Sequence, residues 1–231
     1  MATPASVPVL LTRPEADSLR LAAELPAGTH AIVAPLLRIV FLPFDVARVP
    51  AAASLILTSG HGVAAWTASD GGARGAWCVG PRTAEMAARA GLDLRGQAPT
   101  ADALLDRIPA DASPLVHLRG AHHRGAMVDR LRARGLRASA LTAYRADACP
   151  LTPAALTALR DGPVVAPVFS PRTARLLSAA CPIESRGNLR PVALSPAVAQ
   201  ALPVPPAAVA ERPDGAAMRA AIQRVIDAIL G

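Results

Sequence analysis

Short apolar runs alternate with segments whose apolar residues recur at helical spacing along nearly the whole chain. Runs of four to eight apolar residues bounded by Gly, Pro or polar residues are typical of buried strands, and the segments between them are typical of amphipathic helices. The pattern predicts strands at residues 8–12, 29–34, 36–42, 54–58, 75–79, 92–94, 114–118, 136–144, 164–169, 190–194 and 208–210. It predicts helices at residues 15–25, 62–68, 81–90, 101–108, 123–134, 153–160, 171–180, 196–202 and 215–230.

Strands that alternate with helices of this length indicate right-handed βαβ units and parallel sheets. The predicted fold class is therefore α/β, with two parallel-sheet domains, one inserted in the other. The outer domain takes residues 1–37 and 148–231, and the inserted domain takes residues 43–137. Two extended segments, residues 38–42 and 138–147, are predicted to pair as a two-stranded β linker. Functional sites in open α/β sheets lie beyond the carboxyl ends of the strands, and two such edges facing each other would form a cleft.

Three predicted strand-to-helix junctions share one pattern, in which Gly or Ser precedes a proline. They are Gly80-Pro81, followed by Thr83, then Ser170-Pro171 and Ser195-Pro196. Proline suits the first turn of a helix, and the amides of a helix N-terminus favour anions. Any one junction taken alone is better interpreted as an ordinary strand-to-helix turn. Their recurrence favours a ligand with several negative groups. Further candidate contacts at strand ends are Arg13, Thr58, Ser59, Arg119 and Gly120.

Composition changes this interpretation only slightly. Aromatic residues make up 3% of the 231 residues and hydrophobic residues 52%, so Ala, Val, Leu and Ile must build the core. The net charge is +7 and every basic side chain except histidine is arginine, which binds carboxylates and phosphates bidentately. High-GC coding is the favoured explanation of the missing lysines, and the net charge adds only weak support for an anionic partner. The arginines are scattered and aromatic residues are few, which disfavours nucleic acid as a partner.

The cysteines and the hydropathy profile indicate a compartment. Cys78, Cys149 and Cys181 are odd in number and widely spaced, so they form neither a disulfide framework nor a metal motif. No apolar run approaches the length of a membrane span, and residues 1–6 lack the pattern of a signal peptide. We expect a cytoplasmic protein that does not associate with membranes.

Several catalytic motifs are absent or unconvincing. No phosphate-binding loop with lysine and no dinucleotide-binding glycine turn occurs. The adjacent His122 and His123 would point in different directions on a helix and have no accompanying carboxylate, so no metal site is expected. A Ser59–His61 dyad would lack a third orienting group. His117, inside an apolar strand, is interpreted as a core residue.

Tyr144 is the single tyrosine of the chain and lies near the end of the predicted connection between the domains. A phenol can donate a proton or a hydrogen bond to a leaving group or a carboxylate. A tyrosine at this position can also simply pack on the edge of a sheet. Its place at the mouth of a predicted cleft makes it a candidate catalytic residue.

An ordered set of motifs resembles the uroporphyrinogen-III synthase family over nearly the whole chain. The set is Leu10-Leu11-Thr12-Arg13-Pro14, Leu57-Thr58-Ser59 with Val63, Val79-Gly80-Pro81-Arg82-Thr83-Ala84, His117-Leu118-Arg119-Gly120, Gly135, Tyr144-Arg145 and Phe169-Ser170-Pro171. The resemblance implies two α/β domains joined by a two-stranded linker. It also implies an enzyme that cyclises the linear tetrapyrrole hydroxymethylbilane to uroporphyrinogen III, with inversion of the last ring, loss of water and no cofactor or metal.

The resemblance also implies roles for individual residues. Tyr144 matches the tyrosine thought to assist departure of the substrate hydroxyl, and Thr58 and Ser59 match a hydroxyl-bearing strand end. Ser195 matches a loop near the C-terminus, although Ala197 and Val198 stand where many members carry a threonine pair. The expected substrate is a polycarboxylate, held mainly by orientation and charge complementarity.

Two hypotheses of function remain open. The first is the enzyme, expected to be a monomer that makes at most a transient contact with the enzyme preceding it in the pathway. The alternative is a non-catalytic two-domain sensor that binds tetrapyrroles or other anions. Tyr144 and Ser59 favour the enzyme.

Overall fold

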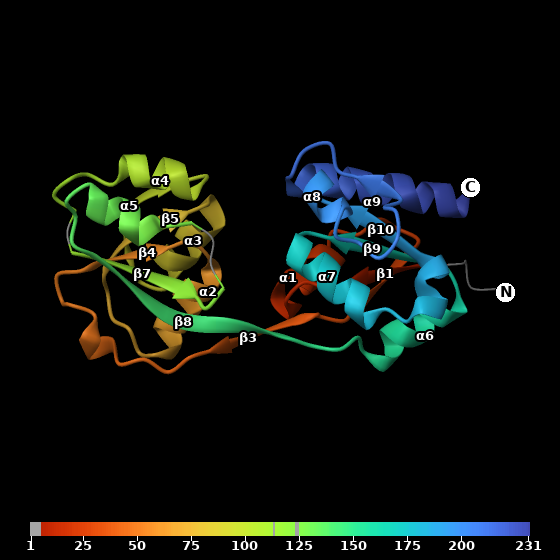
Figure 1. Ribbon diagram of the computed structural model, residues 1–231, viewed down its shortest axis with the longest axis horizontal. Coiled ribbons are helices and arrows are strands. Elements are labelled where there is room, and N and C mark those ends of the chain that lie inside the picture. Colours follow the sequence, from red (N-terminus) through yellow and green to blue (C-terminus); the bar gives the residue numbers. More distant parts are fainter. Residues whose placement is uncertain (1–5, 113, 123–124) are drawn as a thin grey trace. The chain divides into compact units, whose positions relative to one another are not determined.

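The structure is a computed structural model, and it describes residues 6–112, 114–122 and 125–231. The chain divides into two compact units (Figure 1). Unit 1 comprises residues 1–38 and 147–231, and unit 2 comprises residues 39–146. Among the described residues, no helix combines the length and the apolar character needed to cross a membrane.

Unit 1 is a five-stranded sheet with helices on both faces (Figure 1). The strand order is β11-β10-β9-β1-β2, and these neighbours pair in parallel. One face packs against α6, α7 and α8, and the other packs against α1 and α9. Its elements are β1 (Val7–Leu11), α1 (Glu15–Ala22), β2 (Thr29–Val33), α6 (Pro153–Asp161), β9 (Val164–Val168), α7 (Pro171–Ala180), the 3-10 helix η2 (Ile183–Asn188), β10 (Leu189–Ala193), α8 (Pro196–Ala199), β11 (Ala208–Val209) and α9 (Gly215–Leu230).

Unit 2 contains a six-stranded sheet in the order β3-β8-β7-β4-β5-β6. Residues of α2 and α3 cover one face, and residues of α4 and α5 cover the other. Its elements are β3 (Leu37–Phe41), the 3-10 helix η1 (Val46–Arg48), β4 (Ser54–Leu57), α2 (Gly60–Ala68), β5 (Gly75–Val79), α3 (Pro81–Arg89), β6 (Asp93–Ala98), α4 (Ala101–Arg107), β7 (Leu115–Gly120), α5 (Met127–Ala133) and β8 (Ala138–Ala148). β3 and β8 are neighbours in this sheet and cross the division between the units.

The predicted α/β class with parallel sheets is confirmed. The finer domain boundaries and the role of β3 and β8 as a linker stay predictions. The alternation of buried positions explains why the class could be predicted from the sequence. Leu55 and Leu57 of β4 face α2 and α3, while Ile56 between them faces α4 and α5.

Three predicted helices differ from the structure by three residues or more at one end. The helix expected over residues 196–202 is α8, which ends at Ala199. The helix expected over residues 15–25 ends at Ala22, because Leu25 precedes Pro26 and a residue before proline is disfavoured in helical conformation. The helix expected over residues 123–134 is α5, which begins only at Met127. Gly125 has a φ of +82°, a left-handed conformation that a helix cannot contain. The predicted start at His123 lies outside the described residues.

Two strands are longer than predicted. The strand expected over residues 92–94 is β6, which continues to Ala98 through the polar residues Arg95 and Gln97. It lies at the edge of the sheet, where polar side chains are common and the apolar pattern fades. The extended run at residues 136–144 is β8, which begins at Ala138 and continues to Ala148.

Candidate functional site

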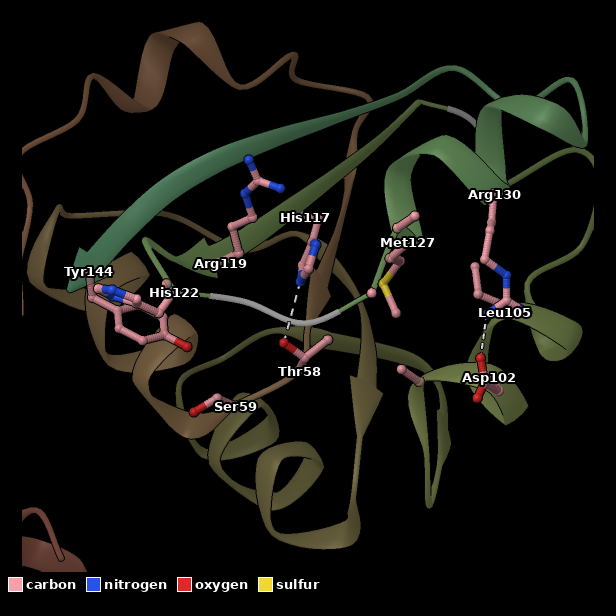
Figure 2. A pocket seen from close by; sticks show the side chains of 14 residues that line it. Thr58, Ser59, Asp102, Leu105, His117, Arg119, His122, Met127, Arg130 and Tyr144 are labelled. Carbon is pink, nitrogen blue, oxygen red and sulfur yellow. Dashed lines mark hydrogen bonds and ion pairs between the residues drawn. The ribbon is translucent and has the colours of Figure 1, made fainter. Parts of the chain in front are cut away.

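The carboxyl ends of three neighbouring strands in unit 2 surround a cavity of about 230 Å³ (Figure 2). β4 leads into Thr58 and Ser59, β7 ends in Arg119 and Gly120, and β8 carries Tyr144. Because β4, β7 and β8 run parallel, their carboxyl ends meet at one edge of the sheet. The structure therefore brings five of the predicted site residues together.

A bulge in β8 sets the position of Tyr144. Arg119 pairs with Thr142, whereas the next residue, Gly120, pairs with Tyr144, so β8 carries one extra residue at this point. An extra residue of this kind re-aims the side chain that follows it. A Cβ atom at Gly120 would lie 2.8 Å from Cε2 of Tyr144, so the phenol ring occupies space that only glycine leaves open. The His61 ring lies against the same phenol edge-on, with ring centroids 5.6 Å apart.

Two hydrogen bonds act on the Tyr144 phenol, from the Ser59 side chain and from the Gly120 backbone. Burial is the largest influence and raises the pKa of Tyr144, while these two hydrogen bonds lower the pKa. A hydrogen bond lowers the pKa of a phenol when it is donated to the phenol oxygen. The Ser59 hydroxyl oxygen in turn accepts the backbone N–H of His61 at 3.2 Å, as the N-cap of α2. The net effect keeps the phenol protonated at neutral pH.

The Oγ1 atom of Thr58 lies 3.3 Å from Nε2 of His117, within hydrogen-bond distance (Figure 2). His117 is 5% exposed and lines the cavity. The sequence interpretation of His117 as a core residue is thus right about its burial and wrong about its surroundings. Sequence reasoning missed it because strand periodicity predicts burial but does not distinguish an apolar neighbour from a cavity.

An ion pair forms another part of the wall. Arg130 of α5 binds the carboxylate of Asp102 of α4, and both line the cavity (Figure 2). Leu105 and Met127 add apolar surface, and the exposed His122 also contributes. No sequence signal singled out Asp102, Arg130 or Met127, since their proximity depends on how α4 and α5 pack.

The predicted residues Gly80, Pro81 and Thr83 lie at the junction of β5 and α3 and are not among the described residues that line this cavity. Gly80 has a φ of +81° and Pro81 is the first residue of α3, as the pattern predicted. Thr83 is buried. Their proposed contacts with substrate stay predictions.

The remaining predicted residues belong to unit 1. Arg13 follows β1, forms an ion pair with Asp17 at 2.9 Å and lies 4.5 Å over the ring of Phe169. Ser170 caps α7, where its hydroxyl oxygen accepts the backbone N–H of Thr173 at 3.1 Å. Ser195 occupies the N-cap position of α8 without a side-chain capping hydrogen bond. All three predicted residues lie at carboxyl ends of strands in the sheet of unit 1.

Comparison with known proteins decides the family. The family model described as uroporphyrinogen-III synthase HemD matches residues 3–220. The chain belongs to the uroporphyrinogen-III synthase family. A comparison with curated protein sequences finds no match.

Two solved structures of the uroporphyrinogen-III synthase family share the fold. The Helicobacter pylori enzyme is 13% identical with a TM-score of 0.67, and the match covers 96% of this chain and 99% of that one. A mutant enzyme from the extremely thermophilic bacterium Thermus thermophilus is 18% identical with a TM-score of 0.55, and the match covers 97% of this chain and 99% of that one. Family members are cyclising lyases of haem biosynthesis, and membership assigns this chain the conversion of hydroxymethylbilane to uroporphyrinogen III.

Proposed function

We propose that the cavity of unit 2 is where this chain acts on hydroxymethylbilane, with Tyr144 as the acid that assists departure of the terminal hydroxyl. The observation that carries the proposal is the position of the Tyr144 phenol, which lines the cavity together with Thr58, Ser59 and Arg119. Ser59 and the Gly120 backbone lower the pKa of Tyr144, as donors to the phenol oxygen would, and such donors leave the proton of Tyr144 to a ligand in the cavity. Burial keeps that proton in place at neutral pH, as a general acid requires.

The same contacts suit the step that follows proton transfer. When the substrate C–O bond breaks, the proton of Tyr144 passes to the leaving oxygen, which departs as water, and the substrate becomes an electrophilic azafulvenium cation that keeps its pyrrole N–H. The phenolate then accepts the hydrogen bonds of Ser59 and Gly120, which stabilise its charge. Ring closure at the substituted carbon through the spiro intermediate releases one proton from the substrate, and this proton restores Tyr144. The overall balance is loss of one water.

The charge of the cavity fits the substrate class. Each pyrrole ring of hydroxymethylbilane carries an acetate and a propionate, and guanidinium groups bind carboxylates bidentately. Arg119 lines the cavity beside Tyr144, and Thr58 adds a hydroxyl. We propose that each of these two residues binds a carboxylate of the substrate. Further proposed carboxylate contacts are Gly80, Pro81, Thr83, Arg13, Ser170 and Ser195.

The proposal extends to the state in which the chain works. We propose a monomer in the cytoplasm that uses no nucleic acid or membrane partner and makes a transient contact with the enzyme that supplies hydroxymethylbilane. The reason for that contact is chemical, because the open tetrapyrrole closes on its own without inversion. Sedimentation of the purified protein at several concentrations tests the monomer. A concentration-dependent rise in mass would contradict it.

Product analysis tests the proposed function. Hydroxymethylbilane is supplied, the products are oxidised, and type I is separated from type III uroporphyrin. We expect mainly type III, formed at a rate that rises with protein concentration. Formation of type I alone would reject the enzyme in favour of the non-catalytic sensor, and binding of tetrapyrroles would then be measured.

A further inference from the structure

One buried side chain at the cavity, the His117 imidazole, has no role in the chemistry described above, although it contacts Thr58, which does. His117 is the only histidine among the described residues of β7, and its Nε2 lies 3.3 Å from Oγ1 of Thr58, which follows the neighbouring strand β4 (Figure 2). A buried imidazole costs free energy unless its polar atoms are paired. The pair could therefore be a satisfied core contact, or it could serve the ligand.

The alternation of β7 places the pair on the side of the cavity. Val116 and Leu118 pack with α2 and α3 on one face of the sheet. His117 and Arg119, which lie between and beyond them, point to the opposite face and line the cavity next to α4 and α5. Both also line an adjoining cavity of about 310 Å³ together with Asp129 and Arg132. His117 thus lies between two cavities, and the Thr58 hydroxyl that it contacts lines the first of them.

The direction of the hydrogen bond decides what Thr58 can offer a ligand. A threonine hydroxyl has one proton and two lone pairs. If Nε2 of His117 accepts the proton of Thr58, only lone pairs face the cavity, and these repel a carboxylate. If Nε2–H donates to Oγ1, the hydroxyl proton stays available to a carboxylate in the cavity.

We infer that His117 is a positioning residue, whose Nε2–H donates to Oγ1 of Thr58 so that the Thr58 hydroxyl donates to a carboxylate of the substrate. The inference rests on the proposed function for the identity of that carboxylate. It assigns His117 no contact with the reacting atoms. A carboxylate bound away from the reacting centre interacts equally in the ground state and the transition state, so the pair affects KM rather than kcat.

The test is a double-mutant cycle with two matched histidine variants. His117→Gln keeps a side-chain N–H near the position of Nε2, whereas His117→Asn places its amide near the position of Nδ1. We expect Thr58→Val and His117→Asn each to raise KM by roughly ten- to a hundredfold, the usual worth of a hydrogen bond to a charged group. kcat should stay within about twofold, and His117→Gln should restore most of the affinity.

The cycle separates action through Thr58 from an independent role. In the Thr58→Val background, His117→Asn should cause no further rise in KM, because the hydroxyl on which it acts is gone. A second full rise, or a KM of His117→Asn equal to that of the wild type, would overturn the inference. A purely structural role would instead lower the midpoint of thermal unfolding in both histidine variants and change kcat and KM alike, which would also overturn it.

A spectroscopic measurement checks the donor directly. The nitrogen NMR signals of the His117 ring, assigned by their loss in His117→Gln, should show a proton on Nε2 in the free protein. A proton found only on Nδ1 would overturn the inference whatever the kinetic results. Failure of the proposed function is distinguishable from failure here, because it shows as absence of type III product from the wild-type protein.

Discussion

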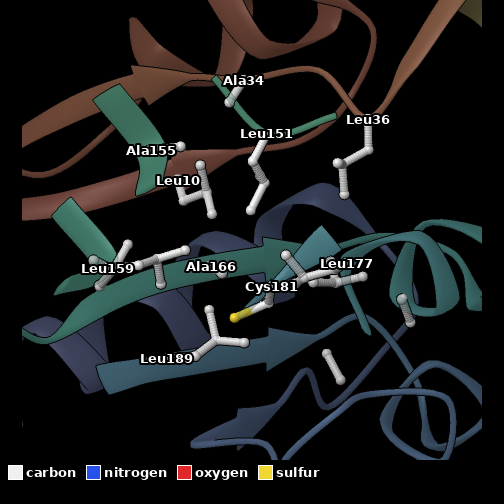
Figure 3. Packing of buried hydrophobic residues seen from close by; sticks show 14 of the residues in the cluster. Leu10, Ala34, Leu36, Leu151, Ala155, Leu159, Ala166, Leu177, Cys181 and Leu189 are labelled. Atoms are coloured by element: carbon white, nitrogen blue, oxygen red, sulfur yellow. The ribbon is translucent and has the colours of Figure 1, made fainter. Parts of the chain in front are cut away.

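The two units share a scaffold and differ in how they use its carboxyl edge. In both, a sheet made mainly of parallel strands lies between two helix layers, and helices begin at Ser-Pro or Gly-Pro junctions. Unit 1 packs a core of small aliphatic residues such as Leu10, Ala166 and Leu177 (Figure 3). At its edge, Arg13 is engaged by Asp17 and the Ser170 hydroxyl caps its own helix.

In unit 2 the corresponding edge holds a cavity with a phenol, a hydroxyl and a guanidinium in its wall. The difference comes from β8, which places Tyr144 beside β7 through a one-residue bulge. The βα junctions supply similar strand ends in both units, while a bulge in one strand of unit 2 places Tyr144 at the proposed reactive site. The following predictions test this contrast, from the largest expected effect to the smallest.

Gly120→Ala should cause a large loss of turnover. The added Cβ would lie 2.8 Å from Cε2 and 3.1 Å from Cζ of Tyr144, so the phenol ring must move. A displacement of about 1 Å can lower a rate by roughly 10²-fold. The control is Gly187→Ala in unit 1, where a Cβ meets nothing within 4 Å. Steady-state formation of type III product measures both variants, and equal rates would show that the ring position does not matter.

Arg119→Gln should weaken binding of the uroporphyrinogen product by about tenfold, the worth of one charge-assisted hydrogen bond. Arg13→Gln should weaken binding by only about twofold, because the Asp17 carboxylate already compensates the charge of Arg13. Anaerobic titration of each variant with product gives the dissociation constants. A larger effect at Arg13 than at Arg119 would mean that the carboxyl edge of unit 1, and not the cavity of unit 2, contributes more to binding of the product.

Asp102→Asn should tighten product binding by about two- to fivefold, since it removes a negative charge from the cavity wall and releases Arg130 from its ion pair. The gain should shrink at high salt. Asp93→Asn is the matched control, because Asp93 pairs with Arg95 at 2.7 Å on the exposed surface of the same unit. An equal gain in the control would mean that net charge alone, rather than the cavity, governs affinity.

Ionisation of Tyr144 should not change turnover below about pH 10, the ordinary pKa of a phenol. Burial raises the pKa of Tyr144, so the protonated acid is the form present below that value. Any stability that depends on the neutral phenol is likewise present below it and is lost as the pH rises through the raised pKa. The measurement compares kcat of wild type and Tyr144→Phe from about pH 7 to about pH 10. A fall in kcat of the wild type at a pH well below the ordinary phenol pKa, with no such fall in Tyr144→Phe, would contradict the raised pKa.

Much of the fold was predictable, because apolar runs and helical spacing report burial directly. The strand-end rule also placed Thr58, Ser59, Arg119 and Gly120 at one edge, since their strands are recognisable. The bulge opposite Gly120 was not predictable, because a single extra residue leaves the apolar pattern of β8 unchanged. The pairing of Asp102 with Arg130 was equally hidden, since it depends on the packing of two helices and joins residues 28 positions apart in sequence.

The most direct measurement of the central claim compares Tyr144→Phe with Ser195→Ala in the rate of type III uroporphyrinogen formation from hydroxymethylbilane. Each variant removes one hydroxyl at the carboxyl edge of one unit. We predict that Tyr144→Phe lowers the rate by on the order of 10²-fold, as expected for loss of a general acid. Ser195→Ala should stay within about threefold of the wild type. An unchanged rate for Tyr144→Phe beside a severe loss for Ser195→Ala would contradict the placement of the chemistry in unit 2.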